Sequence, residues 1–319
     1  MKVHDLIVIG SGPAGDTAAL YAQRAGIQTL VLEKAAFGGQ VAVTSRVDNY
    51  PGATEVDGYS LMESMKSQAQ EFGAMYENRE VLDVRISGDR NHFLLITPTE
   101  AIACKSVIAC FGSKPARAGF KGEQEFTGRG VSYCATCDGM FYRNKHVFVC
   151  GGGNSAAQEA LHLSHIASQV VVLVRKNQMR ADRYLVDQLE HAENVEIRYN
   201  TSLVEVSGTE LLDSLNIRDN TTGELTQISF EEGSVGVFVF VGNNPQTEPV
   251  KSILSLDDSG HIITDQDMRT SVNGLFAAGD CRAKSLRQIV TATSDGAIAA
   301  LTAAQYLNEE NRDNISYVK

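Results

Sequence analysis

Two cysteines three positions apart, Cys134 and Cys137, are the residues of this sequence best suited to chemistry. A Cys-x-x-Cys segment serves either as a redox dithiol or as half of a zinc site. There is no second Cys-x-x-Cys, and His162 and His165 fall on an expected helix elsewhere. The pattern therefore favours a redox dithiol and predicts no metal site. The adjacent Asp138 is the candidate for moving a proton to or from a thiolate.

A glycine-rich segment near the N-terminus has the pattern of a dinucleotide-binding turn. The apolar run Leu6–Ile9 leads into it, and an Ala-rich helical pattern follows. The first glycine makes a tight turn, the second lets backbone approach a pyrophosphate, and the third lets helix and strand pack closely. A carboxylate at the end of the next strand accepts hydrogen bonds from a ribose 2′-hydroxyl. Dinucleotide contacts are therefore expected at Gly10, Gly12, Pro13, Ala14, Gly15 and Glu33.

The same pattern returns 141 residues later, from Gly151 onwards, after the apolar run Val147–Cys150. The acid at position 33 has no counterpart, because Val174 stands there and basic residues follow. A cationic cluster at this place suits the 2′-phosphate of NADP, and the alternative is a solvated basic turn. The second set of nucleotide contacts is expected at Gly151, Gly153, Asn154, Ser155, Ala156, Arg175, Lys176 and Arg180.

These two repeats predict an α/β protein with two Rossmann-like, doubly wound nucleotide-binding domains. Residues 246–319 belong to neither repeat and are expected to complete the first domain. The predicted domains are therefore 1–115 with 246–319, and an inserted domain over 116–245. Expected strands lie at 29–32, 92–97, 105–109, 170–174, 196–199, 215–218, 235–241 and 274–280, with an Ala-rich helix at 295–307.

Composition narrows the class of protein further. The chain has 319 residues, of which 43% are hydrophobic, so it can bury a sizeable core and is not a disordered chain. Its net charge of −11, without basic runs, makes nucleic acid and anionic membranes poor partners. No apolar run approaches the roughly 18 residues of a membrane span. The charged N-terminus does not resemble a secretion signal, so a cytoplasmic protein is expected, with its other four cysteines buried.

The segment Val131–Gly139 resembles the active-site motif of the low-molecular-weight, bacterial-type thioredoxin reductases, and the similarity extends over essentially the whole chain. The resemblance implies a homodimer that passes electrons from NADPH through FAD and the cysteine pair to thioredoxin. It places NADPH at the second glycine loop with Arg175 and Arg180. FAD contacts are implied at the first glycine loop, Gly38, Gly39, Gln40, the segment Asn49–Gly52, Gly279, Asp280, Arg287 and Gln288.

The resemblance also implies separate roles for the two sulfurs: Cys137 faces the flavin, and Cys134 exchanges with thioredoxin. A large rotation of the NADPH domain would alternate the two contacts. Three departures bear on the electron donor: Val174-Arg175-Lys176 replaces His-Arg-Arg, Asn154 replaces Asp, and Cys110-Phe111-Gly112 replaces Ala-Thr-Gly. Tyr317 is a candidate to cover a flavin in a partner subunit.

Three alternatives stay open at this point. The same chemistry on this fold is also fed by ferredoxin or by a second flavin in place of NADPH. A ferredoxin–NADP reductase shares the fold but needs no Cys-x-x-Cys. A nucleotide-sensing or zinc-binding module would use the loops for recognition alone, and flavin absorption in the purified protein separates it from the others.

Overall fold

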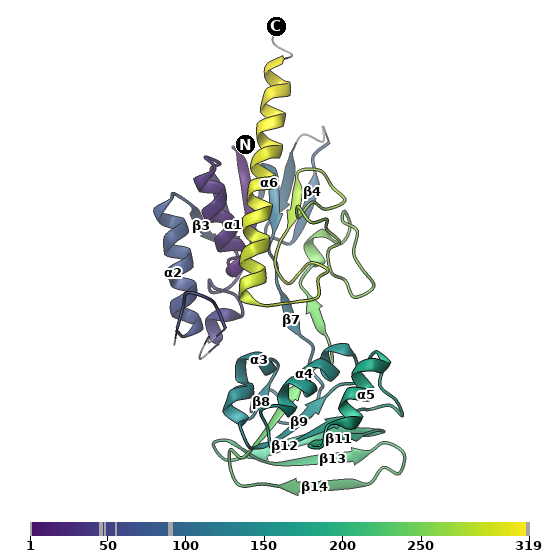
Figure 1. Ribbon diagram of the computed structural model, residues 1–319. Helices are drawn as coiled ribbons and strands as arrows, with labels where there is room; N and C mark the ends of the chain where they lie inside the picture. The colour runs from purple at the N-terminus through teal and green to yellow at the C-terminus, as the bar shows by residue number, and fades with distance from the viewer. Residues whose placement is uncertain (1, 45–46, 48, 55, 89–91, 317–319) are drawn as a thin grey trace. The chain divides into compact units, whose positions relative to one another are not determined.

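The computed structural model describes residues 2–44, 47, 49–54, 56–88 and 92–316 of the 319 (Figure 1). The chain divides into two compact units. Unit 1 combines Met1–Lys114 with Asn244–Lys319, and unit 2 is the inserted segment Pro115–Asn243. The expected boundaries differ from these by one or two residues. Tyr317 lies outside the described residues.

Unit 1 is built on a seven-stranded sheet with the strand order β3-β2-β1-β6-β5-β4, and β17 pairs with β6. The strands around β1 run parallel to it, whereas β4 and β5 are antiparallel to their neighbours. The bounds are β1 Val3–Ile9, β2 Thr29–Glu33, β3 Met75–Asn78, β4 Asp83–Ile86, β5 Phe93–Ile96, β6 Ala101–Ala109 and β17 Leu275–Ala277.

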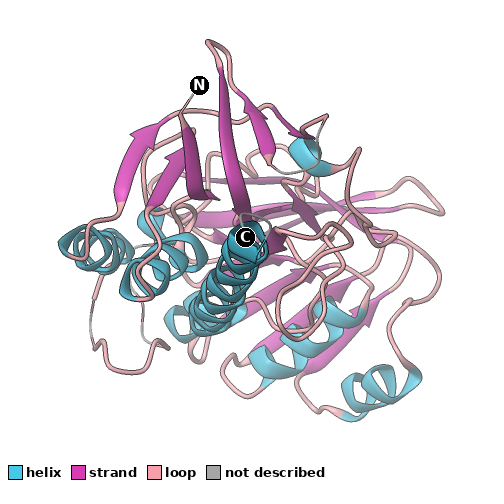
Figure 2. Cartoon of the chain, turned by 90° about the horizontal axis from the view of Figure 1, so that it is seen from above, coloured by secondary structure: helices cyan, strands magenta, loops and turns pink. Residues whose placement is uncertain are grey.

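Alternating side chains of the central strand β1 serve two different cores. Leu6 and Val8 pack with alanines of helices α1 (Pro13–Arg24) and α6 (Ile289–Ser316), while Ile7 and Ile9 pack on the other face with β4 and β5. Both faces are buried, as is usual for a parallel strand. The two helices approach closely, because a Cβ on Gly296 would lie 2.2 Å from the Ala14 carbonyl oxygen. Figure 2 looks down α6 from its C-terminal end.

Unit 2 repeats the plan with a fully parallel five-stranded sheet in the order β11-β10-β9-β15-β8. Helices α4 and α5 cover one face and an antiparallel three-stranded sheet, β12-β13-β14, covers the other. The bounds are β8 Val131–Ser132, β9 His146–Cys150, α4 Asn154–Ser164, β10 Gln169–Leu173, α5 Arg183–His191, β11 Val195–Arg198, β12 Thr201–Gly208, β13 Leu212–Asp219, β14 Leu225–Ser229 and β15 Val235–Val239.

The remaining elements are short, except for one helix of unit 1. They are η1 Val41–Val43, α2 Gly58–Glu71, β7 Ser113–Pro115, α3 Ala135–Asp138, η2 Gly139–Tyr142, β16 Asn243–Pro245 and η3 Glu248–Val250. The chain passes from one unit to the other through β7 and returns through β16, and these two strands pair with each other. No helix within the described residues is both long enough and apolar enough to span a bilayer.

The predicted fold class is confirmed, and the expected strands occur with shifted ends. The last helix is longer than expected, since it begins at Ile289 rather than at Asp295. The strand expected at 274–280 is confined to Leu275–Ala277, because Gly279 adopts a φ of 80° and turns the chain. The four cysteines outside the Cys-x-x-Cys are free and buried, as predicted.

Candidate active site

The cysteine pair lies at the start of the one-turn helix α3. Cys134 is the N-cap residue, and its Sγ accepts a hydrogen bond from the backbone N–H of Cys137 at 3.2 Å. The two residues form a disulfide with their Cα atoms 5.3 Å apart, and both are only partly buried. A backbone N–H directed at the Cys134 sulfur favours its thiolate once the bond is reduced. The arrangement is suited to thiol–disulfide exchange.

Asp138 belongs to the same hydrogen-bonded turn. The Ser132 hydroxyl donates to Asp138 Oδ2 at 2.6 Å and accepts the backbone N–H of Cys134 at 3.1 Å. Burial raises the pKa of the Asp138 carboxyl, and the hydrogen bond from Ser132 opposes this only in part. A carboxyl group that keeps its proton to higher pH than usual can donate it to a departing thiolate.

The first glycine loop is anchored through Ser11. Its backbone N–H donates to Glu33 Oε2 at 2.9 Å, and its carbonyl oxygen accepts the N–H of Gly38 at 2.6 Å. No side chain caps α1 at Gly12, and a Cβ on Gly12 would project into open space. The loop therefore offers room and uncapped helical N–H groups to an anion such as a pyrophosphate.

Glu33 also accepts hydrogen bonds from the backbone, a structural role that the sequence analysis missed. Besides holding Ser11, its second carboxylate oxygen accepts the N–H of Ala35 at 3.0 Å. A carboxylate has about four acceptor positions, so these two bonds leave capacity for a ribose hydroxyl. The predicted contact between Glu33 and a ribose thus remains a proposal. In addition, Glu33 stabilises the backbone of the loop.

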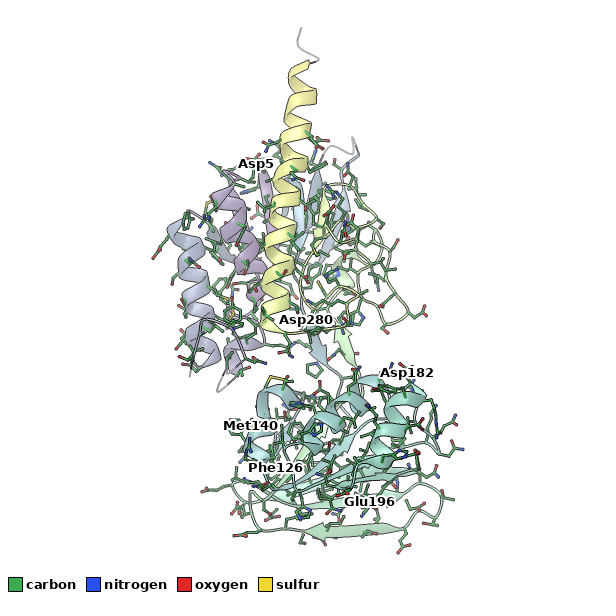
Figure 3. All side chains as sticks on the ribbon, in the orientation of Figure 1. Asp5, Phe126, Met140, Asp182, Glu196 and Asp280 are labelled. Carbon is green, nitrogen blue, oxygen red and sulfur yellow. A yellow bond between two sulfur atoms is a disulfide. The ribbon has the colours of Figure 1, made fainter. Side chains whose placement is uncertain are left out.

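The other predicted flavin contacts in unit 1 include two buried polar atoms without a partner. Among the described residues, Asp280 Oδ1 and Arg287 Nε are buried and have no hydrogen bond, and the Lys284 Nζ lies 3.8 Å from the Asp280 oxygen. Burial raises the pKa of Asp280, while Lys284 and Arg287 lower it. Buried polar atoms are nearly always paired, so unpaired ones are consistent with a missing polar ligand. Figure 3 shows Asp280 beside the first turn of α6.

Two further predicted contacts come together across the chain. The Asn49 side-chain amide donates to Gln288 Oε1 at 3.0 Å, although 239 positions separate them. Gly39 lies against the glycine loop, since a Cβ on it would be 3.5 Å from the Gly12 Cα. The neighbouring Gln40 is exposed. The residues present in unit 1 therefore fit a dinucleotide with hydroxyl-bearing and phosphate groups.

The second glycine loop has a different lining. Its N-cap residue Gly153 has no side-chain cap and faces open space, as Gly12 does. The backbone N–H of Arg180 donates to the Gly152 carbonyl oxygen at 2.6 Å, which places Arg180 beside the loop. The side chains of Arg175, Lys176 and Arg180 are all exposed. This loop therefore combines an open helix terminus with three available cations.

Asn154 is tied to Asp182 at the start of α5, which Figure 3 labels. Its Oδ1 accepts the backbone N–H of Asp182 at 2.8 Å, and its Nδ2 donates to Asp182 Oδ2 at 3.0 Å. A carboxylate at position 154 would face another carboxylate and lose the second bond. The departure from Asp at this position thus has a local cause. Ser155 is exposed and Ala156 is fully buried.

Sequence reasoning also missed two apolar side chains directly after the cysteine pair. Met140 and Phe141, in η2, are 54% and 51% exposed, and Figure 3 labels Met140. Large apolar groups on a surface beside a reactive pair are typical of a protein-binding patch. Their position immediately after a redox motif was the signal available in the sequence.

Comparison with known proteins agrees with this site. The model of the pyridine nucleotide-disulphide oxidoreductase family matches residues 4–296. The thioredoxin reductase of Peptoclostridium acidaminophilum is 43% identical over 310 residues, covering 96% of this chain and 98% of the relative. That of Peptoclostridium litorale is 44% identical over 311 residues, covering 97% and 98%. The crystal structure of thioredoxin reductase from Streptococcus pyogenes superimposes with a TM-score of 0.88 at 39% identity, covering 96% of this chain and 99% of that one.

The chain belongs to the pyridine nucleotide-disulphide oxidoreductase family, and this membership implies a flavin and a pyridine nucleotide as cofactors. Within that family it groups with the bacterial-type thioredoxin reductases, as the resemblance of its motifs indicated.

Proposed function

We propose that this protein is an NADPH-dependent thioredoxin reductase that carries FAD. The observation that carries the proposal is the partly exposed Cys134–Cys137 disulfide, held on a helix N-terminus beside the half-buried acid Asp138 and the exposed apolar side chains of Met140 and Phe141. The relatives named above are thioredoxin reductases, and their similarity extends over nearly the whole chain. A cytoplasmic homodimer is part of the proposal.

Unit 1 is proposed to hold FAD. The first glycine loop would receive the pyrophosphate, Glu33 the ribose, and Asp280 the hydroxyl-bearing chain next to the flavin. When bound, the flavin would carry two electrons from the nicotinamide to the cysteine disulfide. The protein's own contribution is to position this chemistry and to supply protons.

Unit 2 is proposed to hold NADPH at its own glycine loop. Val174 replaces the acid that would select a free ribose hydroxyl, and Arg175, Lys176 and Arg180 offer positive charge to a 2′-phosphate. Because these cations are exposed, the nucleotide can enter and leave within a catalytic cycle.

The thiol chemistry follows from the geometry of the pair. The Cys134 thiolate, stabilised by the Cys137 N–H, attacks one sulfur of the thioredoxin disulfide and forms a mixed disulfide. The leaving sulfur of thioredoxin takes a proton, which Asp138 is placed to supply. The ionised Asp138 then takes the proton of the Cys137 thiol, and the Cys137 thiolate attacks Cys134 Sγ, which restores the Cys134–Cys137 disulfide. The thioredoxin sulfur that leaves Cys134 takes this proton from Asp138, so thioredoxin is released with two thiols. Each turn thus transfers two electrons and two protons to thioredoxin.

An anaerobic titration of the purified holoenzyme tests the proposal. Two equivalents of NADPH, one for the disulfide and one for the flavin, should bleach the flavin absorbance, NADH should do so far more slowly, and oxidised thioredoxin should restore it. The Cys134→Ser variant should still bleach with NADPH but not pass electrons to thioredoxin. Bleaching by reduced ferredoxin alone would contradict NADPH as donor and favour the ferredoxin-fed alternative. A protein that binds no flavin would contradict the proposal as a whole.

A further inference from the structure

Asp16, in the first turn of α1, is a buried carboxyl group for which the proposed chemistry has no use. Its relative exposure is 1%. Its Oδ1 accepts hydrogen bonds from the Ser11 hydroxyl at 2.7 Å and from the Tyr76 hydroxyl at 3.1 Å. Its Oδ2 is buried without any hydrogen-bond partner among the described residues. An ionised carboxylate with one oxygen bare of donors is costly in such a place, and a neutral acid costs less.

The donor Ser11 is the residue that fixes the first glycine loop. Its N–H is held by Glu33 at the end of β2, its carbonyl oxygen by Gly38, and its hydroxyl by Asp16 on α1. Three segments of unit 1 thus meet on one residue, which stands between the glycines at positions 10 and 12. Loss of any one of these bonds would loosen the backbone that a pyrophosphate must contact.

The charges around Asp16 come from each element packed against this part of α1. Lys66 of α2 lies 4.0 Å from the centre of the Phe37 ring and 5.7 Å from that of Tyr76. Tyr76 and Glu33 approach from β3 and from the end of β2. Behind them are the buried thiol of Cys110 and, on α6, Asp295. Asp295 is paired with Arg282 at 3.0 Å and Lys284 at 2.8 Å.

Together these groups place the pKa of Asp16 within the physiological pH range. Burial raises the pKa of Asp16 to about 7, in spite of the opposing hydrogen bonds from Ser11 and Tyr76 and the opposing charge of Lys66. The carboxylate of Glu33 adds a smaller upward effect. The acid thus changes its charge near neutral pH directly beside a loop that is proposed to hold two phosphates.

We propose that Asp16 is a positioning residue for the FAD loop, which it holds through Ser11 as a neutral acid, and that its ionisation weakens dinucleotide binding. The inference rests on the proposed function, because it takes FAD as the ligand of this loop. Its physical basis is repulsion: a carboxylate behind the loop would face the negative charge of the pyrophosphate within a weakly screened interior. By linkage, bound FAD favours the protonated acid, and FAD affinity falls as pH rises through the pKa of Asp16.

The test measures the dissociation constant of FAD for the flavin-free protein by flavin fluorescence between pH 6 and pH 9. In the wild type it should rise by about tenfold over this range, which corresponds to a pKa difference of one unit between the free and the bound protein. Asp16→Asn, which cannot ionise, should bind FAD with a constant nearly independent of pH. Asp258→Asn, an exposed acid of the same unit, should behave as the wild type.

Tyr76→Phe provides a second variant that keeps the acid in place. It removes one donor that stabilises the carboxylate, so the midpoint of the pH transition should move to higher pH. An Asp16→Asn protein with the same pH dependence as the wild type, or a wild type with none, would overturn the inference while leaving FAD as the cofactor. Absence of FAD binding at every pH would overturn both the inference and the proposed function.

Discussion

The two glycine loops share one backbone plan but differ in what lies behind them. Ser11 and the buried acid Asp16 stand in the first loop, where the second has Gly152 and the fully buried Ala157. At the end of the following strand, the first unit has a carboxylate and the second has Val174. Polar side chains that hydrogen-bond to one another therefore lie behind the first loop, whereas apolar side chains lie behind the second.

The difference suits two different lifetimes of the bound nucleotide. The first loop is fixed from inside by Ser11, which favours a cofactor that stays in place. The second is fixed from outside by Arg180 and by the Asn154–Asp182 pair, and its cations are exposed. Pre-organisation by buried hydrogen bonds lowers the cost of ordering a site and slows release of its ligand. The comparison thus supports the proposal that unit 1 holds a resident flavin and unit 2 an exchanging nucleotide.

The largest effect is expected from substitution of either cysteine of the pair. These variants should lose the thiol chemistry of unit 2 and keep the flavin of unit 1. Cys134→Ser and Cys137→Ser should each reduce thioredoxin reduction to background, since exchange requires both sulfurs. Both variants should retain the wild-type flavin content, measured by absorbance of released flavin. Cys150→Ala is the matched control, because burial raises the pKa of the Cys150 thiol to about 12 and makes it unreactive. Turnover by either serine variant would contradict the assignment.

Asp138→Asn should have the next largest effect. The acid supplies a proton to the departing thiolate, and such groups typically contribute about 10²–10⁴-fold to a rate. Because burial raises the pKa of Asp138, its proton is present at lower pH and is lost as pH rises through that pKa. Wild-type turnover should therefore fall as the pH rises through the pKa of Asp138. The Asp138→Asn protein should be slow at every pH and should not show this fall. The rate is measured by stopped-flow reoxidation of the reduced protein with oxidised thioredoxin. Glu193→Gln, which changes an exposed acid of unit 2, is the control.

Much of this arrangement follows from local sequence patterns. A strand, three spaced glycines and an alanine-rich helix have few structural solutions, so both loops and the fold class were predictable. The redox role of the cysteine pair was equally predictable, since its spacing suits a dithiol and the sequence has no second Cys-x-x-Cys to complete a zinc site. These features depend on neighbours within a few positions.

The parts that escaped prediction depend on contacts between distant segments. Asn49 meets Gln288, and Asp182 meets Asn154, only because the folded chain brings them together. Nothing in the local pattern around Asp16 distinguishes it from an ordinary polar residue of a first helical turn, and its buried hydrogen bond with Tyr76 of β3 forms only in the folded chain. The antiparallel sheet β12-β13-β14 was anticipated only through part of β13, because half-buried strands alternate weakly.

Asp280→Ala sharpens the assignment of the flavin to unit 1. Its Oδ1 accepts no hydrogen bond in the described structure, and Lys284, 3.8 Å from it, is held more closely by Asp295 at 2.8 Å, so the alanine variant should lose little stability without flavin. Loss of a hydrogen-bonded contact to the bound flavin should cost about 1–3 kcal/mol and raise the dissociation constant of FAD roughly 5- to 150-fold. Thermal unfolding of flavin-free protein and FAD binding are measured in parallel. Equal loss of stability in both forms would make Asp280 a turn residue only.

Arg175→Ala should have the smallest effect. It tests whether the exposed cations at the second glycine loop bind the 2′-phosphate of NADPH. The backbone at this turn is held independently of the side chain, because the Arg175 carbonyl oxygen accepts the Asn220 amide at 3.1 Å. Truncation should therefore leave the turn in place and remove only charge. An exposed phosphate contact is worth about 1.4 kcal/mol, so the preference for NADPH over NADH should narrow roughly tenfold.

The salt dependence of that preference separates a phosphate contact from a change of loop shape. Because the cations are exposed, the wild-type preference for NADPH should shrink as ionic strength rises, and the Arg175→Ala protein should show a shallower dependence. Arg183→Ala, which removes an exposed arginine paired with Asp187 on α5, is the matched control and should keep the wild-type preference. Flavin reduction rates with the two nucleotides supply both measurements. Equal rates with NADPH and NADH in the wild type would mean that the basic turn is merely solvated, and the contrast between the two loops would then rest on Ser11, Asp16 and Glu33 of unit 1.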